Sequence, residues 1–416
     1  MDLLKGNQKF AVLLCSLKST NPVNLESKEF FEDLFVNDCE DGLNRYWREA
    51  SHDNISLTGS KVFGWRELPQ SLKEFKGISD RTDRILKAAE HFAKEGNDQV
   101  DFRSFTGIIV VTDQGVDLTG ASRRMFDLNG ETRPYRVVIC SQESTHTEIA
   151  HEMGHSFGLK HSLNTNPVSC SPKNDSTPGA YCDRWDIMSA KRVKSFHSSR
   201  FGKSGPLLNA VNMNFLGWLD DSRVVKTSGT TYNMKLRPLS RPDLSGPLAI
   251  QFSNLLIEFR INKGWDRGFN MSGVLIRRMN DPHSVLLGYP NIEFLKKGDQ
   301  YKEGTPRFGP YLEIKVMDID LENDSATIAV DYMPAKRGYQ SGIIHWIVEG
   351  IIGISTSGKP VVVPPPRPPI HDILIGIAMN ELAESLADSE NKAALREASM
   401  NLIAETAKKE INSLRE

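Results

Sequence analysis

The stretch that decides the fold is His151-Glu152-Met153-Gly154-His155-Ser156-Phe157-Gly158-Leu159-Lys160-His161, which reads H-E-x-x-H-x-x-G-x-x-H. His151 and His155 are four residues apart, so on a helix both imidazoles lie on one face and can bind the same metal ion. Gly158 can take the left-handed conformation that ends a helix, after which the chain can return His161 as a third ligand. Three protein ligands leave the fourth position of a tetrahedral Zn²⁺ open for water, which is typical of a catalytic site.

Glu152 directly follows the first histidine, so its carboxylate lies beside the metal instead of pointing at it. That position suits a general base that takes a proton from a zinc-bound water. The plain alternative is a soluble helix that carries three surface histidines by accident. Five fixed positions at this spacing arise by chance on the order of once in 10⁵ sequences of this length, so we favour the metal site.

The residues before the motif predict a helix that starts just ahead of it. The apolar run Tyr135–Cys140 is typical of a strand, and Ser144 and Thr145 can cap the helix that follows. Met153 and Phe157 contribute to an apolar face opposite the ligands.

A second motif lies downstream, in Trp185-Asp186-Ile187-Met188-Ser189-Ala190. Metzincin peptidases share the long histidine motif followed by a methionine turn, and this chain resembles them, with Met188 as the turn methionine below the metal. A methionine alone is usually a core residue, so this assignment depends on the first motif. The metzincin variant with a tyrosine two residues after the methionine does not fit, because Ala190 stands there. We therefore expect no tyrosine as a further ligand.

A closer resemblance, to the gametolysin-like and immune-inhibitor-A-like families, covers about residues 8–334. The stretches that carry it occur in the same order as in those families: Phe10–Cys15, Glu29–Phe35, Tyr46–Ser51, Leu57–Trp65, Leu207–Leu219, Ile257–Arg260 and Gly264–Gly268. The resemblance implies a catalytic domain built on a twisted mixed sheet, a zinc helix and a Met-turn. It also implies an extracellular protein.

The pattern along the chain predicts an α+β fold. Up to about residue 160, apolar strands alternate with helical segments, as in a twisted sheet covered by helices. The strands are expected at Phe10–Leu14, Ser56–Phe63 and Gly107–Thr112, and the helices at Ser27–Phe35, Gly42–Ala50 and Ser79–Lys94. The resemblance places an antiparallel edge strand at Gly115–Asp127, to which an extended substrate could add as a further strand.

From Ser222 to Met333 the pattern changes to short alternating strands with turns, which predicts a β-sandwich. The strands are expected at Leu248–Phe252, Leu255–Arg260, Gly273–Arg277, Tyr311–Met317 and Ala326–Tyr332. Such a domain could dock a substrate or cover an apolar surface of the peptidase domain.

Four regions follow: a metzincin-like zinc peptidase domain at 1–220, a β-sandwich domain at 221–335, a connecting segment with a polyproline linker at 336–370, and a helical tail at 371–416. The linker Pro364-Pro365-Pro366-Arg367-Pro368-Pro369 is a stiff spacer. Two helices are predicted beyond it, over Asp372–Asp388 and Lys392–Leu414, as a C-terminal helical hairpin. The hairpin cannot bury its apolar stripe alone, so three alternatives are open: it packs on the body, dimerises or binds a partner.

The 416 residues carry a net charge of −2, with 39% hydrophobic and 25% charged residues, as in globular proteins. This balance predicts neither nucleic acid nor an anionic membrane as a partner, whereas the peptidase motif predicts a protein or peptide substrate. No apolar run reaches the roughly 18 residues that a membrane span needs. Phe10–Leu14 is too short for the core of a signal peptide, so the secretion that the resemblance implies has no visible leader in this sequence.

The chain has five cysteines and no C-x-x-C motif, which argues against a zinc ribbon or a dithiol redox site. Cys15 and Cys140 fall in apolar strands and are predicted to be buried thiols. Cys170 and Cys182 both lie in the loop between His161 and Met188, where a disulfide would brace the loop in an oxidising compartment.

These features together predict a zinc-dependent endopeptidase. His151, His155 and His161 would bind Zn²⁺, and Glu152 would activate the zinc-bound water that attacks the peptide bond. Two alternatives stay open: a protease effector or toxin of narrow specificity, directed by the helical tail, and a zinc-binding interaction protein without catalysis. The intact Glu152 argues against the second of these.

Overall fold

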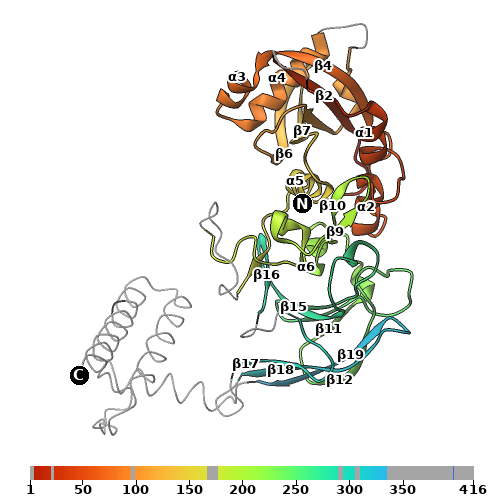
Figure 1. Cartoon of the computed structure of the whole chain (residues 1–416). Helices are drawn as coiled ribbons and strands as arrows, with labels where there is room; N and C mark the ends of the chain where they lie inside the picture. Colours follow the sequence, from red (N-terminus) through yellow and green to blue (C-terminus); the bar gives the residue numbers. More distant parts are fainter. Residues whose placement is uncertain are drawn as a thin grey trace, which may run out of the picture. The chain divides into compact units, whose positions relative to one another are not determined.

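The computed structural model describes residues 4–19, 23–94, 99–165, 177–288, 294–304, 310–334 and 397 (Figure 1). The chain divides into two units: Met1–Glu303 with Leu312–Met333, and Gly304–Tyr311 with Pro334–Glu416. The polyproline linker predicted within 336–370 and the helical tail predicted at 371–416 lie outside the described residues, except for Glu397. The described residues combine helices with several sheets, in agreement with an α+β protein.

A five-stranded sheet contains most of the strands before the histidine motif. Its order is β4 (Lys61–Ser71), β2 (Phe10–Lys18), β5 (Gly107–Thr112), β7 (Glu131–Ser141) and β6 (Thr119–Leu128). The first four strands are parallel, and β6 runs antiparallel to β7 at the edge. The antiparallel edge strand expected at Gly115–Asp127 is therefore confirmed, with its start at Thr119.

Helices cover both faces of this sheet, because the side chains of each strand alternate between its two faces. One face packs on α3 (Leu72–Gly77) and α4 (Arg81–Lys94). The other face packs on α1 (Lys28–Phe35), α2 (Leu43–Ala50) and α5 (His146–Ser156). The short 3-10 helix η1 (Phe102–Ser104) precedes β5.

The prediction of one strand over Ser56–Phe63 is wrong. The chain there forms the short strand β3 (Ile55–Ser56), which pairs with β1 (Gly6–Asn7), and β4 begins only at Lys61. Gly59 has a φ of +89°, a left-handed conformation that interrupts an extended strand.

Short elements follow α5. They are β8 (Leu163–Asn164), η3 (Ile187–Arg192), β9 (Phe196–Ser198), β10 (Gly202–Ser204), α6 (Ala210–Phe215) and η4 (Asp221–Arg223). Figure 1 shows α5 between the five-stranded sheet and α6. Within the described part of the chain, no helix is both long enough and apolar enough to cross a bilayer.

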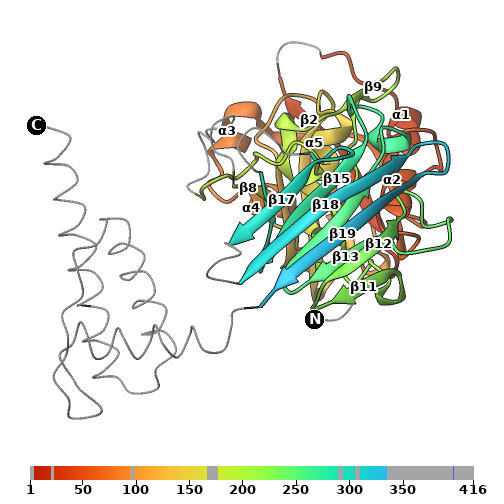
Figure 2. The ribbon, with the colours of Figure 1, turned by 90° about the horizontal axis from the view of Figure 1, so that it is seen from below.

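Two further sheets contain the strands of the second half. The six-stranded sheet has the order β11 (Val224–Thr227), β13 (Ala249–Phe252), β14 (Leu255–Arg260), β15 (Gly273–Asn280), β16 (His283–Leu286) and β8. The four-stranded sheet has the order β12 (Thr231–Leu236), β19 (Ser325–Met333), β18 (Tyr311–Asp320) and β17 (Gln300–Gly304) (Figure 2). The 3-10 helix η5 (Gly264–Asp266) lies between β14 and β15 in sequence.

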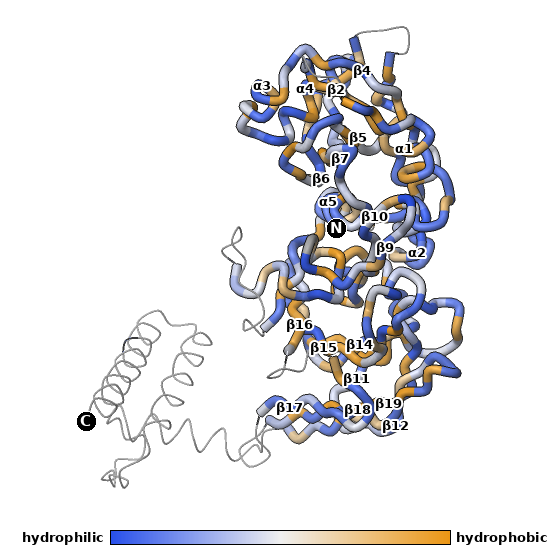
Figure 3. Tube along the Cα trace, in the orientation of Figure 1, coloured by the Kyte–Doolittle hydropathy of each residue, from blue (hydrophilic) through white to orange (hydrophobic). Residues whose placement is uncertain are grey.

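One buried cluster joins these two sheets. Ile257 of β14 and Val274 of β15 belong to it from one sheet, and Ile314 of β18 and Ile328 of β19 from the other. Along the chain, β14 is mostly hydrophobic, whereas β17 consists of hydrophilic residues (Figure 3). The two sheets therefore pack face to face around a common core.

The strand β8 connects the histidine motif to the six-stranded sheet. It follows His161 closely and pairs in parallel with β16, Leu163 opposite Val285 and Asn164 opposite Leu286. The boundary predicted at residue 220 thus divides this sheet, because β8 lies before residue 220 and the other five strands lie after it. The neighbours are far apart in sequence, so no local pattern could reveal this pairing.

Candidate metal centre

The helix that carries the histidine pair begins with a reciprocal cap. The Thr145 side chain accepts a hydrogen bond from the Glu148 N–H (3.4 Å), and the Glu148 carboxylate accepts one from the Thr145 N–H (3.0 Å). These bonds satisfy two N–H groups that the first turn of a helix leaves unpaired. Ser144 caps a different turn, because its Oγ accepts from the Ser141 N–H. The sequence therefore fixes where α5 starts, and with it the position of the first two ligands.

The rings of His151 and His155 are oriented by backbone carbonyl groups. His151 Nδ1 lies 3.0 Å from the Ile187 oxygen, and His155 Nδ1 lies 2.8 Å from the Leu159 oxygen. A carbonyl oxygen can only accept, so each Nδ1 carries a proton and donates it. A neutral imidazole protonated at Nδ1 has its lone pair at Nε2. Both histidines therefore present an Nε2 lone pair to the site.

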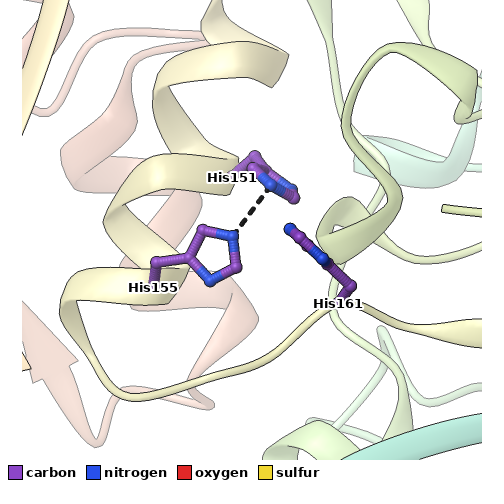
Figure 4. A group of neighbouring side chains, drawn as sticks. All are labelled: His151, His155 and His161. Carbon is purple, nitrogen blue, oxygen red and sulfur yellow. Dashed lines mark hydrogen bonds between the residues drawn. The ribbon is translucent and has the colours of Figure 1, made fainter. Parts of the chain in front are cut away.

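These two lone pairs face each other. The Nε2 atoms of His151 and His155 lie 3.0 Å apart (Figure 4). With both protons on Nδ1, no hydrogen atom is left to join them, and facing lone pairs repel. A metal ion between them removes that repulsion, so the donor pair fits a metal ion.

His161 completes the group from beyond the helix. Gly158 has a φ of +104°, which turns the chain out of α5, as the sequence predicts. The ligand nitrogens of His151, His155 and His161 all lie within 4.8 Å of one another. Among the described residues they form the one group of three or more such side chains close enough to share a metal ion.

Burial keeps the first two histidines neutral. It lowers the pKa of His155 to about 4 and the pKa of His151 well below its ordinary value, because a charged imidazole loses its hydration there. The neighbouring histidines lower both pKa values further. Neutral imidazole is the form that binds metal ions, so His151 and His155 are in their binding form at neutral pH.

Glu152 lies beside the three histidines in a partly buried position. Burial raises the pKa of its carboxyl group to about 7, although a hydrogen bond from the Gly120 backbone and the charge of Arg81 act in the opposite direction. Gly120 belongs to the edge strand β6, so the carboxylate lies where β6 meets α5. A carboxyl group with a pKa near neutrality can both take up and release a proton at pH 7.

Met188 is fully buried below the helix, as predicted for a turn methionine. A Cβ atom at Gly154 would overlap its sulfur atom, so the two residues are in close contact. The turn also holds the first ligand, because the carbonyl group that orients His151 belongs to Ile187. Met188 thus packs under α5 without a polar role of its own.

Asp186 fixes this turn to its surroundings. Its carboxylate accepts hydrogen bonds from the backbone N–H groups of Met188 (2.8 Å) and Asn209 (2.6 Å). It also accepts one from the hydroxyl group of Ser162 (2.8 Å), the residue after the third histidine. One buried carboxylate therefore ties the Met188 turn, the start of α6 and the chain next to His161 together.

Reasoning from sequence missed two groups that contact the third ligand. His283 of β16 donates from Nδ1 to the His161 carbonyl oxygen (3.0 Å). The ring of Tyr181 lies 3.9 Å from the ring of His161, centroid to centroid. Both contacts join residues from separate parts of the chain, and no spacing rule connects them to the histidine motif.

Three of the cysteines are free thiols, namely Cys15, Cys39 and Cys140, and the first and last are buried as expected. Cys182 is disulfide-bonded. Cys170, its predicted partner, lies outside the described residues, so the pairing stays a prediction.

In comparisons with known proteins, no protein-family model and no curated protein matches this chain. The functional assignment therefore rests on the site itself.

Proposed function

We propose that this protein is a zinc-dependent endopeptidase of the metzincin type. The observation that carries the proposal is the facing pair of Nε2 lone pairs on His151 and His155, with His161 within reach and Glu152 beside them. Bonds of about 2.0–2.1 Å to a tetrahedral Zn²⁺ would place two nitrogen ligands roughly 3.3 Å apart, close to the 3.0 Å between the Nε2 atoms. Imidazole ligands favour Zn²⁺ over Mg²⁺ and Ca²⁺, which prefer oxygen.

The number of ligands supports catalysis over a structural role. Structural zinc sites have four protein ligands, whereas catalytic sites have three and an open position. When bound, Zn²⁺ would supply a Lewis acid that polarises the scissile carbonyl group and lowers the pKa of a water molecule to about 7.

Glu152 would move the proton. Its carboxylate takes a proton from the water as the water attacks the carbonyl carbon, and it returns the proton to the leaving amine. The raised pKa of about 7 suits both steps near neutral pH. His151, His155 and His161 bind and orient, and Met188 supports α5 from below.

The edge strand β6 would bind the substrate. One of its sides pairs with β7, and the other has no neighbouring strand among the described residues. An extended peptide can pair with that free side by main-chain hydrogen bonds, which selects little by sequence. Since Gly120 of β6 contacts Glu152, a peptide bound there would pass the general base.

The proposal is tested by zinc content and cleavage together. Wild type and Glu152→Gln are incubated with an unfolded protein mixture, and new peptide termini are identified by mass spectrometry. Wild type should bind one Zn²⁺ per chain and cut at many sites, and a chelator should stop the cutting. Glu152→Gln should bind zinc equally and lose turnover by at least about 10³-fold, because the general base is gone. Glu131→Gln, an exposed change at the start of β7, should cut as wild type does.

The outcomes separate the alternatives. Zinc binding without any cut in the mixture would contradict a broad endopeptidase and favour either an effector of narrow specificity or a non-catalytic zinc protein. Equal cutting by Glu152→Gln would remove Glu152 from its role. Failure of wild type to bind zinc would overturn the proposal as a whole.

A further inference from the structure

Tyr181 lies against the third histidine of the site. Its ring centroid is 3.9 Å from that of His161, with the planes tilted by 40°, and 6.0 Å from that of His151. The His161 ring therefore lies against one aromatic face from outside the histidine motif. Tyr181 lies between His161 and Met188 in sequence, outside the histidine motif.

The backbone of Tyr181 is in a conformation that a large side chain rarely adopts. Its φ is +59°, in the left-handed region. Such a conformation persists only where the surroundings hold it in place, and it is frequent at functional sites.

The surroundings of Tyr181 provide that hold. Ala180 forms a β-bridge with Leu163, and the Gly179 carbonyl oxygen accepts hydrogen bonds from the N–H groups of Asn164 and Cys182 (both 3.1 Å). Gly179 cannot carry a side chain, because a Cβ atom would overlap the Asn164 carbonyl oxygen. Cys182, the residue after Tyr181, is disulfide-bonded. The residues on both sides of Tyr181 are therefore held next to β8, the strand that follows His161.

The three ligands are held by different contacts. His151 and His155 are held by α5 and by carbonyl groups at their Nδ1 atoms. His161 follows the end of the helix, and its own carbonyl oxygen is held by His283. The bond from His283 holds the backbone of His161, and the Tyr181 ring contacts its side chain.

We propose that Tyr181 is a positioning residue for the metal site: its ring packs on His161 and holds that imidazole in the orientation in which it binds the metal. The proposal rests on the metal site proposed above. The β-bridge of Ala180, the hydrogen bonds to Gly179 and the disulfide bond of Cys182 hold the backbone next to Tyr181. Groups that orient a ligand typically contribute 10- to 100-fold in metal affinity, so an effect of that size is expected.

The test measures Zn²⁺ affinity by competition with a chromophoric chelator, independently of catalysis. Tyr181→Ala should bind Zn²⁺ about 10- to 100-fold more weakly than wild type, because the ring is lost. Tyr181→Phe keeps the ring and should stay within about twofold. Cys182→Ser should shift the affinity in the same direction as Tyr181→Ala. Tyr232→Ala serves as control, because Tyr232 is 68% exposed in the four-stranded sheet.

A double-mutant cycle separates support of His161 from a general loss of structure. If Tyr181 acts through His161, Tyr181→Ala should weaken Zn²⁺ binding much less in a His161→Ala background than in wild type. Additive losses, an unchanged affinity of Tyr181→Ala, or an equal loss in Tyr181→Phe would each overturn the proposal. If wild type itself bound no zinc, the proposed function would fail too, whereas these three outcomes leave it intact.

Discussion

At the scale of single residues, Gly120 shows how closely the edge strand approaches the helix with the histidines. A Cβ atom at Gly120 would overlap the backbone carbonyl oxygen of Glu152. We therefore expect Gly120→Ala to push β6 away from α5, lower the free energy of unfolding by about 1–3 kcal/mol and reduce turnover. Chemical denaturation and the cleavage assay measure the two effects. Gly64→Ala is the control, since its added methyl group meets no atom within 4 Å. Equal effects of both changes would contradict the close approach.

His146 predicts a dependence of stability on pH. Its ring is fully buried, stacks on Trp265 with centroids 5.1 Å apart, and has no hydrogen-bond partner for either nitrogen within the described residues. Burial lowers its pKa to about 3. Between about pH 6.5 and 3 the unfolded chain binds a proton here that the folded protein does not, so stability falls with falling pH, by up to about 1.4 kcal/mol per unit.

The variant His146→Phe keeps an aromatic ring and removes this titration. The free energy of unfolding, measured on the zinc-free protein at several pH values, should fall less steeply between pH 6.5 and 4.5 than in wild type. His197→Phe changes an exposed histidine and should leave the slope unaltered. Parallel curves for wild type and His146→Phe would show that His146 is not the group responsible.

Whether a residue of the site could be predicted from sequence depends on whether its contacts come from residues nearby in the chain. His151, Glu152, His155 and His161 could be predicted because one helix and one glycine turn place them together. Tyr181 could not, because its contact with His161 depends on where a long loop returns. The sequence has Ala190 two residues after Met188 and predicts no tyrosine as a further ligand, and it gives no sign that Tyr181, from the segment before the turn, contacts the His161 ring.

At the scale of elements, the start of α5 depends on the Thr145 cap. Thr145→Ala removes the acceptor for the Glu148 N–H and should lower the free energy of unfolding by about 1 kcal/mol. Thermal unfolding of the zinc-free protein measures this, with Thr58→Ala as the control at an exposed threonine outside any helix. An unchanged midpoint for Thr145→Ala would mean that packing of α5, and not its cap, fixes where the helix begins.

Apolar runs with clear ends could be predicted well from sequence. The bounds of β5 and β14 agree with the expected Gly107–Thr112 and Leu255–Arg260, because both strands are buried on both faces. The split between β3 and β4 was missed, because it depends on the left-handed Gly59. Strand order and register depend on pairings between distant segments, which single-sequence patterns do not contain.

At the scale of the whole first unit, buried charges connect the two halves of the chain. Arg277 of β15 forms ion pairs with Asp183, from the segment before the Met188 turn, and with Glu258 of β14. Arg260 pairs with Asp266 and Glu258 in the same interior. The side chains of all five residues are fully buried, so each charge depends on its partners. Through the Arg277–Asp183 pair, the six-stranded sheet thus supports the segment that leads into the Met188 turn below α5.

This connection predicts that Arg277 supports the metal site from a distance. Arg277→Met keeps much of the side-chain volume but leaves Asp183 and Glu258 without its charge. Breaking a buried pair in this way costs about 3–5 kcal/mol. We expect a loss of that size in the free energy of unfolding, together with weaker Zn²⁺ binding, because Asp183 and the turn that orients His151 are close in sequence.

The neighbouring residue provides a matched control for this change. Arg278 lies next to Arg277 on β15, but its pair with Glu303 is partly exposed, so Arg278→Met should change the free energy of unfolding by less than about 1 kcal/mol. Denaturant titration and chelator competition on both variants separate the two positions. A large loss of stability in Arg277→Met with unchanged zinc affinity would mean that the buried ion pairs hold the sheets together without supporting the site. A loss in both measurements would make the β-sheets part of the structure that positions His151.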